Sequence, residues 1–196
     1  MPKTGMTCTE IREKAIEYAE ERIRRLGFEK IRLIDVAKDL GISHAALYQH
    51  FPDKAALLES VTEKWLMAAD SELETVIKQK KTAAELIVLW FLSLHRIKRK
   101  KVSLDPELFK AFDTAAEENK GCIQKHLSNA QRQLSDLVSQ AMKEGSIKKD
   151  SVPKTVEILF LGTIAFHYPK LVALNLQDSQ EQKLRSVVNA LLSGLK

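Results

Sequence analysis

Apolar residues recur at helical spacing along nearly the whole chain, and few residues interrupt them. Only seven glycines and five prolines occur among 196 residues, so the sequence provides few turns. Apolar and polar residues do not alternate over any long stretch, as they would in half-buried strands. The pattern therefore predicts an all-α protein.

Local signals place several helix ends. Thr7 with Glu10, and Thr82 with Glu85, form capping boxes that begin two helices, and Gly27 is expected to end the first. Residues 86–94 are apolar nearly all round, so we expect that helix at the centre of a bundle. Further helices are predicted over 105–112, 120–144, 151–169 and 184–195.

Composition excludes some classes of protein. With 44% hydrophobic and 29% charged residues, the chain has the balance of a globular protein rather than a disordered one. The net charge of +5 mildly favours a polyanionic partner. Residues 1–54 hold ten basic and nine acidic residues, so total charge alone does not identify a nucleic-acid-binding region there.

The sequence favours a cytoplasmic protein without a membrane partner. Residues 1–10 lack the apolar core of a signal peptide, and the run 83–94 is shorter than the roughly 20 residues that span a bilayer. Cys8 and Cys122 match no metal-ligand spacing, and two isolated thiols fit a reducing compartment. A disulfide between them remains the less favoured alternative.

Residues 33–51 have the pattern of a helix-turn-helix. Two short helices are joined at Gly41, which tolerates a left-handed conformation, and Ser43 can cap the second helix. Leu47 and Phe51 are expected to point into the core. Their helix would lie in the major groove of DNA. The alternative interpretation is an ordinary pair of helices in a core.

The second helix of this pair carries residues that suit DNA. Gln49 can hydrogen-bond an adenine edge, and Ala45 can meet a thymine methyl group. Tyr48, His50 and Lys54 are suited to phosphate oxygens. For His44 and Gln49 the alternative is a plain solvent-facing position. The predicted DNA-binding residues are Arg32, Ser43, His44, Ala45, Tyr48, Gln49, His50 and Lys54.

The run from Val36 to Leu58 resembles the DNA-binding region of the tetracycline-repressor (TetR) family. The matching residues are Ala37, Gly41, Ser43, Ala45, Leu47, Tyr48, His50, Phe51, Lys54 and Leu57. The resemblance implies an all-helical homodimer that binds a palindromic operator in double-stranded DNA. It implies a helix-turn-helix domain over 1–54 and an effector-binding and dimerisation domain over 55–196.

The chain departs from this family at one helix start. The family usually places Thr or Ser at the start of the second helix, where this chain reads Ile31-Arg32-Leu33. Losing the capping hydroxyl typically costs about 1 kcal/mol. We expect Arg32 to contact a phosphate instead.

Aromatic side chains are spread over five predicted helices. They pack a core, or they line an effector pocket whose polar groups are histidines. The predicted pocket residues are Trp65, Trp90, Phe91, His95, Phe109, Phe112, His126, Phe160 and His167. A phenylalanine-rich pocket indicates an apolar or aromatic effector. No spacing supports a metal site among the histidines, and no cofactor is predicted.

Two further features have open interpretations. The basic run from Arg96 to Lys101 is either a solvated helix end or a charged patch that acts near DNA. The apolar stripe from Leu184 to Leu195 packs on its own bundle or on a second copy of the chain. In the TetR family the last two long helices pair across a two-fold axis, which favours the dimer.

These features favour a ligand-responsive transcriptional regulator, with repression as the favoured mode. No nucleophile elbow, phosphate-binding loop or metal-ligand spacing supports an enzyme. Two alternatives stay open. One is a DNA-binding regulator that acts without a small-molecule effector, and the other is a redox sensor that uses the thiol of Cys122.

Overall fold

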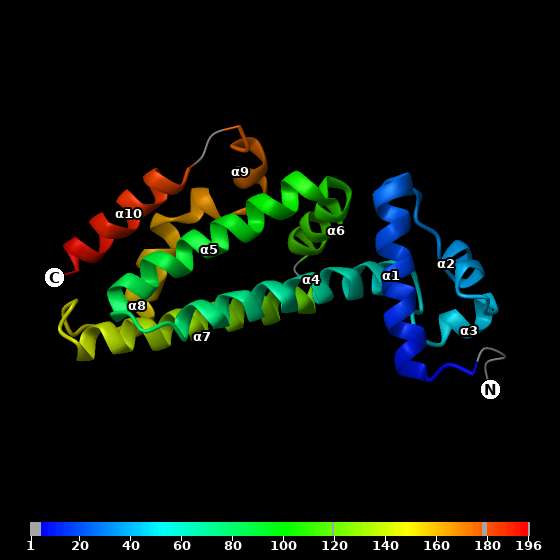
Figure 1. Ribbon diagram of the computed structural model, residues 1–196, viewed down its shortest axis with the longest axis horizontal. Helices are drawn as coiled ribbons and strands as arrows, with labels where there is room; N and C mark the ends of the chain where they lie inside the picture. The colour runs from blue at the N-terminus through cyan, green and yellow to red at the C-terminus, as the bar shows by residue number, and fades with distance from the viewer. Residues whose placement is uncertain (1–4, 119, 178–179, 196) are drawn as a thin grey trace. The chain divides into compact units, whose positions relative to one another are not determined.

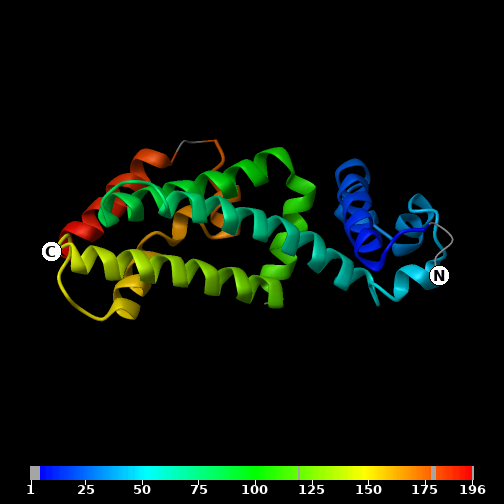
Figure 2. The same cartoon turned by 60° about the horizontal axis from the view of Figure 1, so that its bottom comes forward.

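The computed structural model describes residues 5–118, 120–177 and 180–195. Within these residues the regular elements are helices and no strand is present, which confirms the all-α prediction. Figures 1 and 2 show their arrangement. The first elements are α1 (Cys8–Leu26), the 3-10 turn η1 (Phe28–Lys30), α2 (Leu33–Asp39), α3 (His44–Tyr48) and α4 (Lys54–Ile77). The others are α5 (Ala83–Leu104), α6 (Pro106–Glu117), α7 (Gly121–Lys143), α8 (Val152–Gly162), the 3-10 turn η2 (Ile164–Phe166), α9 (Pro169–Leu174) and α10 (Glu181–Gly194).

Packing divides the chain into two compact units. The first unit comprises the chain up to Leu66 together with Asp105–Ile123, and the second comprises Met67–Leu104 with Gln124–Lys196. Helix α4 contributes residues to both units. This division by packing differs from the functional division predicted at residue 54, and that functional division stays a prediction.

The first unit forms around α1. The hydroxyl of Thr7 accepts a hydrogen bond from the backbone N–H of Glu10 at 3.2 Å, and the Glu10 carboxylate accepts one from the N–H of Thr7 at 2.7 Å. The predicted capping box is therefore present. One face of α1 is buried, and it packs on a core contributed by α2, α3 and α4. This core includes Ile23, Phe28, Leu33, Leu47, Phe51 and Leu57.

Helix α6 belongs to the first unit, although it directly follows α5 of the second unit in the sequence. Leu108 and Ala111 join the buried core of that unit. Asp105, just before α6, accepts a hydrogen bond from the Arg24 guanidinium of α1 at 2.8 Å. Glu107 accepts one from the backbone N–H of Phe28, also at 2.8 Å. Segments about 80 residues apart in the sequence are thereby joined.

The second unit is built around α5. Helix α5 is buried nearly all round through residue 94, as the apolar run predicts. Helix α10 lies beside α5 (Figure 1). Leu184, Val188 and Leu192 of α10 are buried within the chain itself. At least this part of the C-terminal stripe therefore packs on its own bundle.

The helix predicted from 151 to about 169 is wrong in its second half. It ends at Gly162 and is followed by η2 and then by α9. The hydroxyl of Thr163 donates to the carbonyl of Leu159 at 2.7 Å, and the backbone of Thr163 leaves helical geometry. Pro169 also disfavours a helical conformation for Tyr168 before it. These two local features divide the segment.

In the described part of the chain, every helix is too short or too polar to cross a lipid bilayer.

Candidate nucleic-acid interface

The turn between α2 and α3 has the geometry that its sequence predicts. Gly41 has a φ of 68°, which is left-handed and suits glycine. The N–H of Ile42 donates to the carbonyl of Ala37 at 3.1 Å, and the hydroxyl of Ser43 caps α3 by accepting from the N–H of Ala46 at 3.2 Å. Leu47, which is fully buried, fixes α3 on the core.

Helix α3 presents one face to solvent. His44, Ala45 and Gln49 are exposed, and Tyr48 is 42% exposed. The rings of His44 and Tyr48 meet edge to face with centroids 4.3 Å apart. This contact restricts both side chains before any partner binds. The face offers hydrogen-bond donors, acceptors and a methyl group on one short helix, as base-edge recognition requires.

The predicted phosphate contacts differ in their surroundings. Arg32 is exposed, and its guanidinium pairs with Asp35 at 2.8 Å, while no side chain caps the start of α2. Lys54 donates to the carbonyl of Glu29 at 3.0 Å and lies over the ring of Phe28. His50 is partly buried. Arg32 and Lys54 therefore already have partners that a phosphate would have to share.

Two arginines of α1 hold the helix-turn-helix in place, and sequence reasoning did not identify them. Arg12 donates to the carbonyl of His50 at 2.7 Å and lies over the ring of Phe51 at 4.6 Å. Arg22 pairs with Asp39 of α2, and this guanidinium holds the pKa of Asp39 below its usual value. No spacing signal marks these contacts, because the partners lie 17 or more residues apart.

The nine predicted pocket residues are distributed over both units. Three belong to the first unit, where Trp65 and Phe109 each contact Phe112 at centroid distances of 4.7 and 5.5 Å. Six belong to the second unit. There Trp90, Phe91, Phe160 and His167 pack ring against ring, and His95 and His126 lie nearby in the same unit.

Residues of the basic run at the end of α5 contact other parts of the second unit. Lys98 is only 6% exposed, so a solvated helix end describes it wrongly. Arg96 pairs with Glu181 at 2.9 Å, and Arg99 donates to the carbonyls of Asn175 and Leu176 at 2.9 and 2.7 Å. At least two of the five charges, those of Arg96 and Arg99, therefore make polar contacts within this unit.

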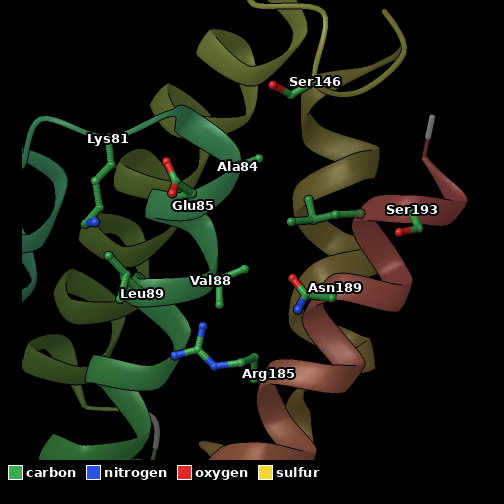
Figure 3. Close-up of a pocket in the computed structure, with 10 residues that line it drawn as sticks. Lys81, Ala84, Glu85, Val88, Leu89, Ser146, Arg185, Asn189 and Ser193 are labelled. Atoms are coloured by element: carbon green, nitrogen blue, oxygen red, sulfur yellow. The ribbon is translucent and has the colours of Figure 1, made fainter.

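A groove of about 360 Å³ lies between α5 and α10. Figure 3 shows Arg185 and Asn189 of α10 pointing toward Val88 of α5 across it. A second groove, of about 260 Å³, lies in the first unit and includes Lys54 in its lining. None of the nine predicted pocket residues lines either groove.

The stability of the chain is expected to fall as the pH drops from about 6.5 to about 4. Burial lowers the pKa of His167 to about 4, whereas an unfolded histidine has a pKa of about 6.5. Between these values the unfolded chain binds the extra proton, so acid favours unfolding. Because His167 is partly exposed, we expect a loss of about 2 kcal/mol between pH 7 and pH 4.5.

Urea unfolding of the native chain and of His167→Phe at both pH values checks this. The native chain should lose about 2 kcal/mol more than the variant on acidification. If the unfolding free energies of the two chains differ by the same amount at both pH values, the lost hydrogen bond to the carbonyl of Phe160 alone accounts for the difference. That result would contradict the prediction.

Comparison with known proteins agrees with this geometry. Residues 15–61 match the model of bacterial regulatory proteins of the tetR family, and residues 83–188, over half of the chain, match the tetracyclin repressor-like C-terminal domain. The nucleoid occlusion factor SlmA of Vibrio atlanticus is 36% identical over 63 residues. That match covers 32% of this chain and 32% of the relative, so the chain spans about a third of that relative's length.

Solved structures show the same fold over nearly the full length. The TetR-family regulator PfmR of Thermus thermophilus superposes with a TM-score of 0.63 at 17% identity, covering 93% of this chain and 99% of that one. The regulator FadR of Bacillus subtilis, solved with stearoyl-CoA, superposes with a TM-score of 0.60 at 22% identity, covering 93% and 96%. With both family domains matched in order, the chain belongs to the TetR family of DNA-binding transcriptional regulators.

Proposed function

We propose that this chain is a repressor that binds a palindromic operator as a homodimer and releases it when a small apolar or aromatic effector binds. The observation that carries the proposal is the exposed face of α3, where His44, Ala45, Tyr48 and Gln49 stand together on a helix fixed by Leu47. Two such helices related by a two-fold axis would enter successive major grooves about 34–36 Å apart.

The proposed dimer forms through α8 and α10. Leu161 of α8 is 61% exposed, and Ile164 beside it is exposed as well. Val187 and Leu191 of α10 remain partly exposed although the rest of the stripe is buried. Gly162 approaches the side chain of Leu191 closely, since an added Cβ would lie 2.7 Å from it. These residues supply apolar surface on adjacent helices.

Effector release requires coupling between two sites. An effector weakens operator binding only by preferring a state that DNA does not prefer. A 100-fold release corresponds to about 2.7 kcal/mol of coupling. Helix α4 supports such coupling because it contributes residues to both units. The chain also passes from α5 into the first unit at Asp105, where Asp105 and Glu107 contact Arg24 and Phe28.

The fold neighbours support a small-molecule effector, and the curated relatives favour an alternative. FadR is named as a complex with stearoyl-CoA. SlmA is named as a nucleoid occlusion factor, which favours a DNA-binding protein that acts without an effector as the second candidate. The thiol-sensor alternative loses support, because burial raises the pKa of Cys122 and reduces its reactive thiolate.

Selection of duplexes from a random DNA pool by the purified chain tests the proposal. We expect a palindrome to be enriched, bound by two chains, with a preference of about 10³-fold or more over scrambled DNA at about 0.15 M salt. A reporter driven from that sequence should be repressed. Enrichment of a site without symmetry, bound by one chain, would overturn the dimeric model. Activation of the reporter would overturn repression.

A further inference from the structure

A buried polar cluster lies inside the second unit, and operator binding does not explain it. His95 and Lys98 stand three residues apart on α5 and are 2% and 6% exposed. His126 of α7 is also buried, and His167 follows η2. Burying polar and charged side chains is costly unless they have partners. The partners of each of these side chains therefore decide what the cluster can bind.

Part of the cluster is satisfied within the chain. The Asp70 carboxylate of α4 accepts a hydrogen bond from Nδ1 of His126 at 2.5 Å and another from the amide of Asn129 at 2.7 Å. The amide of Gln133 donates to Glu74 at 2.8 Å, and its oxygen accepts from the indole of Trp90 at 2.8 Å. This network fixes one side of the cluster, and the Asp70 carboxylate also acts electrostatically on the Lys98 ammonium.

His95 presents an unused acceptor. Its Nδ1 lies 2.7 Å from the carbonyl oxygen of Phe166, and a carbonyl only accepts, so Nδ1 carries the proton. The other ring nitrogen, Nε2, is then an acceptor in the neutral ring, and burial lowers the pKa of His95, which favours that neutral form. Among the described residues, Nε2 of His95 is buried without a hydrogen-bond partner.

The same cluster as His95 also contains the Lys98 ammonium and several aromatic rings. The charge of Lys98 acts on both His126 and His167, and His167 is also within the electrostatic reach of His95. The ring of His95 meets Phe166 at 6.1 Å between centroids, and His167 meets Phe160 at 5.7 Å. Phe160, Phe166 and His167 are partly exposed, so this side of the cluster lies close to the surface of the unit.

We propose that this cluster binds a phenol, whose hydroxyl donates its hydrogen to Nε2 of His95 while the Lys98 ammonium stabilises the phenol oxygen and the nearby phenylalanines contact the ring. A phenol keeps its proton at neutral pH, as the tyrosine side chain does with a pKa of about 10. It therefore brings the donor that the neutral imidazole lacks. A carboxylate arrives without that proton, and an ether has none to give.

This inference rests on the proposed function, since it names the chemical class of the effector. Binding and operator release are therefore measured separately. Isothermal titration calorimetry of the full chain with 2-naphthol, 2-methoxynaphthalene and 2-naphthoate compares one ring system with and without the hydroxyl proton. We expect 2-naphthol to bind about tenfold or more tightly than the other two, because each leaves the buried acceptor unsatisfied.

Variants locate the site. His95→Phe and Lys98→Met should each weaken 2-naphthol binding about tenfold or more, whereas Lys100→Met, the same substitution at an exposed position of α5, should leave it within about twofold. Comparing the three ligands on the native chain needs no variant to fold. Equal binding of the ether or the carboxylate, or full binding by Lys98→Met, would overturn the proposal.

Measuring operator release distinguishes a failure of the phenol site from a failure of the proposed effector-controlled release. If 2-naphthol binds in the cluster and the operator stays bound, the phenol site is supported and effector-controlled release fails. If an effector without a hydroxyl releases the operator and His95→Phe responds to it as the native chain does, the proposed function stands and the phenol site is overturned.

Discussion

Alanine at both His44 and Tyr48 is expected to lower affinity for the selected operator by about 100-fold or more without unfolding the chain. Both side chains lie on the exposed face of α3, and their rings contact each other rather than the core. Each contact to DNA is worth about 1–3 kcal/mol, and a symmetric dimer loses it at both half-sites. The effect on binding therefore exceeds the effect on stability.

Fluorescence anisotropy with the selected palindrome measures this loss, and a thermal melt verifies the fold. Glu17→Ala, on an exposed position of α1, serves as the control and should change affinity by about threefold at most. The salt dependence of operator affinity separates phosphate contacts from base contacts. Lys54→Met removes a positive charge, so it should reduce the slope of log affinity against log salt concentration. Unchanged operator affinity in the double variant would rule out α3 as the recognition helix.

Arginine in place of Leu161 is expected to convert the dimer to monomers and to weaken operator binding by about 100-fold or more. An exposed leucine of α8 becomes buried if α8 pairs with a second copy. A charge at that position would be desolvated without a partner, at a cost of several kcal/mol that the two-fold axis applies twice. A monomer then holds only one half-site.

Leu174→Arg is the matched control, since Leu174 of α9 is 78% exposed and lies outside the proposed interface. Analytical ultracentrifugation should find monomers for Leu161→Arg and dimers for Leu174→Arg. A dimer in both variants would show that α8 does not form the interface. Monomers of the native chain at micromolar concentration would contradict the dimeric repressor itself.

Local sequence determined much of the fold. Thr7 and Glu10 specify the start of α1 because their partners lie three residues apart. Gly41 specifies the turn before α3 because a left-handed residue is needed there. The apolar residues 86–94 predicted a buried central helix because no face of it could remain in water. The outward face of α3 could be predicted for the same reason, since Leu47 and Phe51 fix which side is buried.

Only the tertiary structure decided features that depend on partners distant in the sequence. Lys98 stands in a basic run that the sequence left open as a solvated helix end or a charged patch near DNA, yet packing buries it beside a network anchored on Asp70 of another helix. The start of α6 is held to α1 by Asp105 and to η1 by Glu107, and no periodicity in the sequence indicates these contacts. The nine residues of the predicted aromatic pocket belong to both units, because helical spacing gives the face of a residue and not its neighbour. Local signals fix helices and turns, whereas burial and pairing depend on how those helices come together.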